Sequence, residues 1–248
     1  MKKFAYILIV FLCFACNSED ANDCFQKAGS TIQEEVVVTA FETILVNRNV
    51  SLILKEGPEF QVIIETGRNL INDVEVKVVN NQLRLTDNNT CNFVRDYNAT
   101  KVYVTAPNIT EIRSSTQFEI SSDGVLNYPD LKITSEDFNQ PDYYTVGDFN
   151  LQINSNQLRV VANNISAFYI SGQTQDLNVG FFSGTARFEG RNLIAQNVDI
   201  YHRGSNDIIV NPQQTLTGEL RGTGDLIAVN QPAIVEVEEL YTGRLIFN

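Results

Sequence analysis

The chain has 248 residues, of which 43% are hydrophobic, 19% are charged and 27 are asparagine. This supplies enough apolar material for a globular core, while the low charge content and the asparagines scattered between Val, Ile and Thr runs exclude coiled coils and helical bundles. The formal net charge is −12 and no block rich in Lys or Arg follows residue 3, so no surface would neutralise phosphates and nucleic acid is not an expected partner.

The first fifteen residues have the pattern of an export signal. Lys2 and Lys3 precede an apolar run over residues 4–15, which has the length of a signal-peptide core and is too short to cross a bilayer. The run ends at Ala15-Cys16, and polar residues follow at once. This is similar to a bacterial lipoprotein signal, with residues 1–15 removed and Cys16 lipidated; an ordinary secretory peptide cleaved near Ala15 is the alternative. Both predict an exported protein, and lipidation predicts attachment to the outer membrane on its periplasmic or cell-surface side.

Two cysteines remain after this processing. Cys13 leaves with the signal and Cys16 would carry lipid, so Cys24 and Cys91 are available. In an oxidising envelope compartment they are expected to form a disulfide, with a pair of free thiols as the alternative. After removal of residues 1–15 the sequence contains no C-x-x-C motif and no Cys/His cluster, so we expect neither a metal site of that kind nor a cofactor.

Residues 16–34 are predicted as a polar tether, and residues 35–107 as an N-terminal region of short β-strands. Apolar residues at every second position, separated by turn residues such as Asn80-Asn81, indicate the strands. Lys55-Glu56-Gly57-Pro58 predicts a turn that leads into a hairpin. The expected strands lie around residues 36–38, 44–46, 50–54, 61–65, 74–79, 83–85 and 101–105.

From residue 108 to residue 248 the pattern becomes an apolar pair, a Ser or Gly turn, and a second apolar pair. The turns centre on residues 114, 135, 155, 172, 184, 204, 222 and 243, at intervals of 21, 20, 17, 12, 20, 18 and 21 residues. Most intervals match one coil of a single-stranded β-helix, or β-solenoid, in which each coil buries its apolar face by stacking on its neighbours. The interval of 12 indicates either a coil broken at Phe181-Phe182 or two corners of one coil. The sequence therefore predicts an all-β fold in which the N-terminal strands lead into a β-solenoid.

Several segments together resemble a known family. They are Phe41-Glu42-Thr43-Ile44, Leu52-Ile53-Leu54, Val102–Pro107, Leu220–Leu226 and Thr242–Leu245. Over about residues 38–248 the chain resembles the head GIN domain of auto-transporter adhesins, which allows residues 35–248 to be one continuous domain. The resemblance implies a β-solenoid, a lipid-anchored envelope location and an adhesive or binding role, and it supplies no catalytic residues.

Two carboxylates are candidates for a cation site. The residue before the second strand of each repeat forms a predicted column of Gln117, Asp137, Gln157, Asp176, Arg187, Asp207, Asp225 and Arg244. The spacing of Asp207 and Asp225 would place them on adjacent coils, about 4.8 Å apart, where they could share a proton or bind a cation. Alternatively, each caps its own turn as an Asx residue.

The single histidine, His202, lies in a turn with Ser205 and Asp207. Catalytic triads are assembled from segments that are distant in the sequence, so this cluster is not expected to act as one. His202 is interpreted as a solvated residue at a strand edge.

Residues 135–150 are the strongest candidate for contact with a ligand. Their Pro and Gly predict a loop, in which Tyr143, Tyr144 and Phe149 lie among Asp, Asn and Gln. Such rings can stack on sugar faces while the polar groups bond to hydroxyls; the alternative is that the rings pack back on the solenoid.

The sequence thus predicts a non-enzymatic cell-envelope lipoprotein that acts as a surface adhesin or binding module. Its expected partners are the membrane, through the lipid anchor, and a glycan or an extracellular protein. A structural envelope lipoprotein is the alternative. A carbohydrate-active β-helix enzyme is the third interpretation, although no column of carboxylates suited to glycoside cleavage emerges.

Overall fold

The computed structural model describes residues 24–89 and 91–248, so the predicted signal over residues 1–15 and the predicted lipidation residue Cys16 lie outside the described part. The described residues form seventeen β-strands and one short 3-10 helix, Ile71–Asp73, so the protein is all-β, as predicted. No helix in these ranges has the length and apolar character needed to span a membrane. The strands are β1 (Thr31–Val36), β2 (Thr43–Val46), β3 (Val50–Glu56), β4 (Gln61–Gly67), β5 (Val74–Val79), β6 (Gln82–Asp87), β7 (Thr100–Ala106), β8 (Glu111–Ser114), β9 (Ile120–Leu126), β10 (Asp130–Ser135), β11 (Phe149–Ala162), β12 (Ala167–Phe181), β13 (Arg187–His202), β14 (Ile208–Leu220), β15 (Leu226–Ala228), β16 (Ile234–Glu239) and β17 (Leu245–Phe247).

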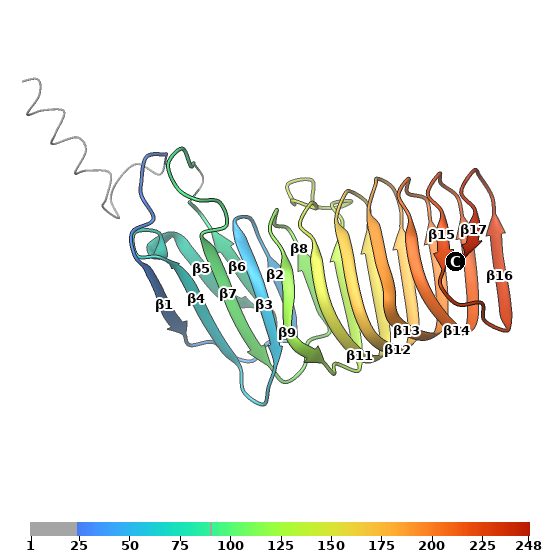
Figure 1. Cartoon of the computed structure of the whole chain (residues 1–248). Helices are drawn as coiled ribbons and strands as arrows, with labels where there is room; N and C mark the ends of the chain where they lie inside the picture. Colours follow the sequence, from blue (N-terminus) through green and yellow to red (C-terminus); the bar gives the residue numbers. More distant parts are fainter. Residues whose placement is uncertain (1–23, 90) are drawn as a thin grey trace, which may run out of the picture.

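The strands lie side by side along one axis, from β1 at the blue end of Figure 1 to β16 and β17 at the red end. Hydrogen bonds join them into one sheet that is folded into two faces. Face 1 contains, in spatial order, β5, β6, β2, β8, β10, the second halves of β11 to β14, and β16. Face 2 contains β1, β4, β7, β3, β9, the first halves of β11 to β14, β15 and β17. Each of the four long strands therefore bends and serves both faces.

From β8 onward, the pairing between neighbouring repeats is parallel. On face 2 the paired positions follow one another at offsets of 18 to 20 residues: Phe149, Phe168, Phe188, Ile208, Leu226 and Leu245. Parallel neighbours need a crossover connection, and here the chain crosses through the opposite face. Six of the seven intervals that the sequence predicts between turns lie within one residue of this range, and the interval of 12 is the exception.

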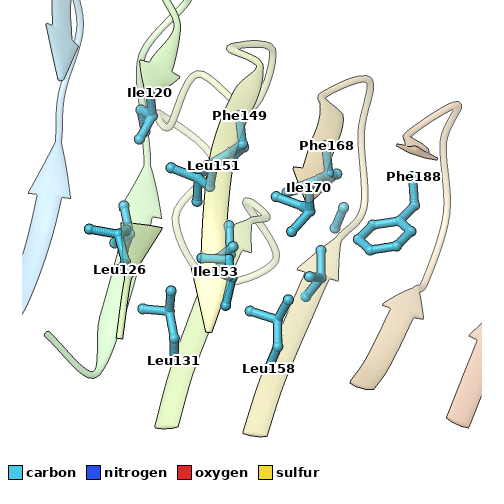
Figure 2. Close-up of a cluster of buried hydrophobic side chains, with 14 of the residues drawn as sticks. Ile120, Leu126, Leu131, Phe149, Leu151, Ile153, Leu158, Phe168, Ile170 and Phe188 are labelled. Carbon is cyan, nitrogen blue, oxygen red and sulfur yellow. The ribbon is translucent and has the colours of Figure 1, made fainter. Parts of the chain in front are cut away.

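Alternating apolar residues fill the space between the two faces. In the first half of β11 the buried residues Phe149, Leu151 and Ile153 alternate with exposed polar ones. Because neighbouring repeats are paired in register, equivalent side chains stack, and Figure 2 shows Phe149, Phe168 and Phe188 on successive strands. The rings of Phe149 and Phe168 are nearly parallel, with centroids 4.9 Å apart. One buried apolar cluster extends from Phe41 to Ala228, so the core is continuous along the stack.

The N-terminal strands are not ordered in space as they are in the chain. β2 and β3 lie between β6 and β7 on one side and β8 and β9 on the other, and they pair in parallel with both neighbours. The sheet therefore runs without a break from residues 35–107 into residues 108–248. β7 lies between β3 and β4, so the hairpin predicted after Lys55-Glu56-Gly57-Pro58 is wrong.

β5 and β6, the strands expected on either side of the Asn80-Asn81 turn, form an antiparallel hairpin. Its turn residues, Asn80 and Asn81, have φ angles of 51° and 59°. Two-residue hairpin turns that match the twist of the strands need such left-handed conformations, which asparagine tolerates better than most residues.

The predicted tether over residues 16–34 is wrong for its described part. β1 begins at Thr31 and pairs with β4. Before it, Gln26 is buried and donates a hydrogen bond to the Asn69 carbonyl oxygen at 2.9 Å. Cys24 and Cys91, the expected pair, are joined by a disulfide, with their Cα atoms 4.4 Å apart. Residues 24–34 therefore belong to the folded body.

The short interval between the predicted turns at residues 172 and 184 arises from two different corners. Gly172 lies inside β12 beside Ile153, near the bend from face 2 to face 1. Gly184 lies between β12 and β13, at the bend that leads back to face 2. These are two corners of one repeat, which was one of the two alternatives, and no repeat is broken at Phe181-Phe182.

Candidate functional site

A loop over residues 136–148, here called the side loop, connects β10 to β11 on the outside of the fold (Figure 1). Near its start, the Asn163 side-chain amide donates a hydrogen bond to the Asp137 carboxylate at 2.8 Å. Near its end, the Gly147 N–H donates to the Thr116 carbonyl oxygen at 3.0 Å. A Cβ at Gly147 would lie 2.6 Å from that oxygen, so only glycine permits this close approach. The side loop is therefore held against the sheet at both ends.

The side loop and the outer surface of face 1 border a hollow of about 630 Å³, here called the lateral hollow. This volume lies within the range of ligand pockets in proteins. Its lining comes from several repeats: the side loop, β11, the bend after β11 and the two following bends. The lining residues are Glu136, Phe138, Asn139, Val161, Asn163, Phe182, Ser183 and Arg203.

Two exposed aromatic rings border the lateral hollow. Phe138, in the side loop, is 83% exposed, and Phe182 is 46% exposed. Phe182 follows the buried Phe181, so the alternation along the strand turns its ring outward. The ring lies over Gly180, where an added Cβ would be 3.0 Å from it, and Tyr201 packs beside it with ring centroids 5.2 Å apart. Because Gly180 has no side chain, the Phe182 ring can lie against the sheet at this position.

The two charged residues of the lateral hollow differ in their partners. Glu136 Oε1 lies 2.8 Å from Arg113 Nη1, and Glu136 Oε2 accepts a hydrogen bond from the Phe138 N–H at 2.9 Å. Burial disfavours the charged carboxylate, but these hydrogen bonds outweigh burial and lower the pKa of Glu136. The Arg203 side chain forms no ion pair or hydrogen bond with any described residue. Of the two charged lining residues, Arg203 is therefore the one whose side chain has no charged partner among the described residues.

The three aromatic residues predicted as ligand contacts differ in their exposure and position. Phe149 is completely buried in the core stack, so its ring cannot contact a ligand and that prediction is wrong. Tyr144 is 48% exposed and its N–H donates a hydrogen bond to Ser115 Oγ, while Tyr143 is half-buried. Neither tyrosine lines the lateral hollow. Both remain predicted contacts of the side loop, outside the hollow.

Phe138, Phe182 and Arg203 were not among the site residues predicted from the sequence. Phe138 lies inside the predicted ligand-binding segment 135–150, but no sequence pattern distinguishes it from the tyrosines of that segment. Phe182 could have been found, because the pair Phe181-Phe182 at a strand end must place one ring inside and the other outside. Arg203 follows His202, which pairs with Phe181, so it takes the position of Phe182 one repeat further on.

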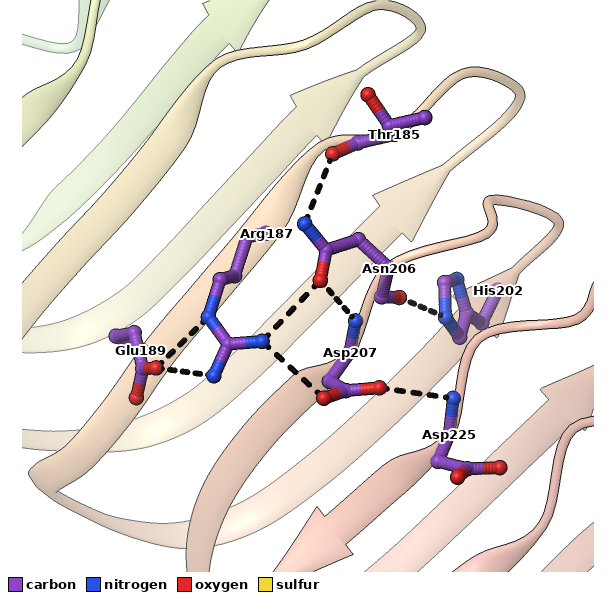
Figure 3. Close-up of polar contacts among 7 residues, drawn as sticks. All are labelled: Thr185, Arg187, Glu189, His202, Asn206, Asp207 and Asp225. Atoms are coloured by element: carbon purple, nitrogen blue, oxygen red, sulfur yellow. Dashed lines mark hydrogen bonds and ion pairs between the residues drawn. The ribbon is translucent and has the colours of Figure 1, made fainter.

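Asp207 and Asp225 do lie on adjacent repeats, because Ile208 pairs with Leu226. Figure 3 shows that Asp207 is already engaged: its Oδ2 lies 3.1 Å from Arg187 Nη1, and its Oδ1 accepts a hydrogen bond from the Asp225 N–H at 3.4 Å. Asp225 Oδ1 in turn accepts from the Arg244 N–H at 2.8 Å. Each carboxylate thus caps the corresponding bend of the next repeat and not its own turn, so the capping alternative is wrong in this detail. Both oxygens of Asp207 already have partners within the protein. Within residues 24–89 and 91–248, no three His, Cys, Asp or Glu side chains group so that they could hold a metal ion.

The predicted column of eight residues is only partly correct. Arg187, Asp207, Asp225 and Arg244 share one position in successive repeats. Asp148 belongs to the same column, since its carboxylate accepts the Ala167 N–H at 2.9 Å in the same manner. Gln157 and Asp176 instead lie in a row on face 1 with Asn197. The error arises because turns at two different corners were counted together.

His202 is completely buried, so its interpretation as a solvated residue is wrong. Its Nε2 lies 2.8 Å from the Asn206 carbonyl oxygen (Figure 3). Its Nδ1 lies 3.3 Å from the Gly204 nitrogen. The ring also meets the edge of Phe181, with centroids 5.9 Å apart. These contacts fit a neutral imidazole that donates from Nε2 and accepts at Nδ1. Burial lowers the pKa of His202, although Asn206, Asp207 and Asp225 oppose the shift.

The lowered pKa of His202 predicts a loss of stability in mild acid. The unfolded chain takes up the proton near pH 6.5, before the folded chain does, so this stabilising contribution is complete above that pH and declines as the pH falls toward the folded-state pKa. The slope cannot exceed about 1.4 kcal/mol per pH unit for one proton. His202→Leu introduces the residue found at the paired position, Leu220, and removes the titrating group. Urea unfolding at pH 7.5 and pH 5 should therefore show a smaller pH dependence in the variant; an equal dependence would exclude His202 as the cause.

A comparison with models of protein families identifies the family of the chain. The model described as "Putative auto-transporter adhesin, head GIN domain" matches residues 40–232. The chain belongs to this family. Membership of the head GIN family indicates a surface or envelope protein, and no curated protein matches the chain significantly.

Solved structures share the fold of this head GIN domain. A "putative adhesin" from Bacteroides fragilis NCTC 9343 is 18% identical and has a TM-score of 0.77, over 90% of this chain and 99% of that one. A "putative adhesin" from Parabacteroides distasonis ATCC 8503 is 11% identical with a TM-score of 0.60, over 89% of this chain and 99% of its own. A "putative lipid binding protein" from the same organism is 13% identical with a TM-score of 0.58, over 88% and 97%. At these identities the likeness shows the fold alone.

Proposed function

We propose that the chain is a non-enzymatic binding module of the bacterial cell envelope, in which a β-solenoid presents the lateral hollow to a glycan or an extracellular protein. The observation that carries this proposal is the hollow itself, where two exposed rings and an unpaired arginine surround about 630 Å³. Exposed apolar groups gathered around a concavity are typical of binding sites.

The solenoid part of the proposal rests on the parallel pairing of successive repeats. Equivalent residues pair at offsets of 18 to 20 residues, and each repeat pairs mainly with the one before and the one after. This is the contact pattern of a protein built by stacking coils. A stack of this kind can present a binding site to a ligand, because side chains from consecutive repeats line the hollow at a fixed spacing.

The carboxylates near the lateral hollow favour binding over hydrolysis. Glycosidases need two carboxyl groups that face each other across the substrate. Among the described residues, Glu136 is the only carboxylate that lines this hollow, and it is paired with Arg113. A carbohydrate-active enzyme is therefore the weaker candidate for this site.

A binding screen tests the proposed function. The exported form of the chain is applied to an array of glycans and extracellular matrix proteins, and we expect at least one ligand that is bound with saturation. A chain that binds no array ligand would contradict the proposal and favour the rival role, a structural envelope lipoprotein.

The membrane anchor is proposed to be a lipid on Cys16. Several acyl chains hold a protein on a membrane, whereas a single chain binds only marginally. Cys16→Ser should therefore move the protein from the membrane fraction to the soluble envelope fraction, or leave its signal uncleaved. Cys13→Ser is the matched control and should change neither. Unchanged membrane partition of Cys16→Ser would contradict the lipoprotein proposal.

A further inference from the structure

We infer that the lateral hollow binds an anionic saccharide, with a sugar ring stacked on Phe182 and an acidic group of the sugar paired with Arg203. This inference rests on the proposed binding function and names the ligand class of the same site.

Phe182 provides a platform of fixed orientation. Its ring lies over Gly180 on the outer surface of face 1 and is flanked by Tyr201 at 5.2 Å. The hollow is also lined by Phe138 of the side loop, which is 83% exposed. The C–H faces of pyranose rings pack on aromatic rings, and a platform that is already held in place loses little conformational entropy on binding.

The polar groups at the hollow can bond to hydroxyls. The Asn139 side-chain amide makes no hydrogen bond with any described residue, so it offers both a donor and an acceptor. Ser183 Oγ donates to the Asn163 carbonyl oxygen at 2.7 Å and keeps its acceptor lone pairs. Groups that donate and accept beside an aromatic platform match a sugar better than they match a purely apolar ligand.

Arg203 selects for a negative charge. It lies one repeat beyond Phe182, in register with it, because Phe181 pairs with His202. Glu136, the acidic residue of the lining, already pairs with Arg113. A free guanidinium binds carboxylate or sulfate oxygens with two parallel hydrogen bonds. An anionic sugar would supply the partner that Arg203 lacks in the described structure.

The backbone around the hollow argues against a peptide ligand that binds by adding a strand. Val161 pairs with Gly180, and Gly180 pairs with Tyr201, so the strands below the hollow have neighbours on both sides. Peptides that dock by strand addition need an open sheet edge. Recognition at this site must therefore use side chains, as saccharide recognition does.

The test compares acidic and neutral sugars on the immobilised full-length chain. The probes are trigalacturonic acid and its methyl ester, and 6′-sulfolactose and lactose. We expect at least one acidic probe to bind roughly tenfold more tightly than its neutral counterpart, and the acidic pair that binds identifies the anion. Phe182→Ala should weaken binding roughly tenfold. Arg203→Gln should remove the preference for the acidic probe.

Two substitutions elsewhere serve as matched controls. Tyr169→Ala removes a ring that is 47% exposed on face 2. Arg191→Gln removes an exposed arginine of β13 that likewise has no ion pair with any described residue. Both should leave binding within about twofold of the original. All four altered positions are exposed or half-exposed, and thermal unfolding checks that each variant remains folded.

The inference is overturned if neither acidic probe binds more tightly than its neutral counterpart, or if Phe182→Ala and Arg203→Gln bind as the unaltered chain does. If the array screen finds a ligand whose binding ignores both substitutions, the inference fails while the proposed binding function stands. If the array screen finds nothing, both fail.

Discussion

Loss of the Cys24–Cys91 disulfide is expected to lower the free energy of unfolding by about 4 kcal/mol. The bond joins residues that are 67 positions apart, and in the chain-entropy model a long closed loop restricts the unfolded chain strongly. The bond also holds the first described residues in place, where the Phe93 N–H donates to the Cys24 carbonyl oxygen at 2.9 Å and the rings of Phe25 and Phe93 lie 5.7 Å apart.

Urea unfolding of the exported chain with and without reductant measures this effect. Cys91→Ser should reproduce the loss, and the double variant Cys24→Ser/Cys91→Ser should be insensitive to reductant. Two thiols that react with an alkylating agent in the native, unreduced protein would rule the disulfide out.

Gly222→Val is expected to destabilise the protein by roughly 3 kcal/mol. Gly222 is at a bend where the chain approaches the preceding repeat, and a Cβ there would lie 2.1 Å from the Gly204 carbonyl oxygen. That oxygen accepts hydrogen bonds from the N–H groups of Thr223 and Gly224 at 3.2 Å. A valine side chain must therefore push the two repeats apart and weaken these bonds. The cause is close approach between backbones rather than a left-handed conformation at this glycine.

Thr223→Val is the matched control for Gly222→Val. It introduces the same residue at the adjacent, exposed position, where no such approach exists. Thermal and urea unfolding should place Thr223→Val close to the original chain. Equal stability of the two variants would mean that the bend tolerates a side chain at Gly222.

Local patterns predicted most strands and the repeat. Alternation in Phe149-Asn150-Leu151 describes a strand with one buried side, and the structure buries Phe149 and Leu151. The same alternation could have corrected the prediction for Phe149, which we placed in a ligand-binding loop because of its aromatic neighbours. Alternation is a stronger signal than the presence of aromatic neighbours, because it predicts whether a residue lies on the buried or the exposed side of a strand.

The order of the N-terminal strands could not be predicted in this way. β2 lies between β6 and β8, and β3 lies between β7 and β9, so the segment near residues 43–56 separates strands that come later in the chain. The strands have similar apolar faces, so the alternation of apolar residues in one strand does not predict which strand it pairs with. The pairing is decided by how all strands fit together.

The candidate site depends on contacts between segments that the sequence separates. The segment 135–150 was found from its composition, but the hollow also needs Phe182, the gap at Gly180 and Arg203 from later repeats. An alignment of equivalent positions in successive repeats places Arg203 at the position of Phe182. The predicted turns combined two different corners of the repeat, so this alignment could not be made.

Hydrogen exchange on Gly222→Val tests most directly the claim that the protein is a stack in which each repeat depends on its neighbours. The altered bend lies near the C-terminal end of the stack, while β2, β3 and β7 lie several repeats away. Local contacts predict faster exchange over residues 200–247 and unchanged protection over residues 43–106. Equal loss of protection in both ranges would contradict the stack and indicate a fold that opens as one unit.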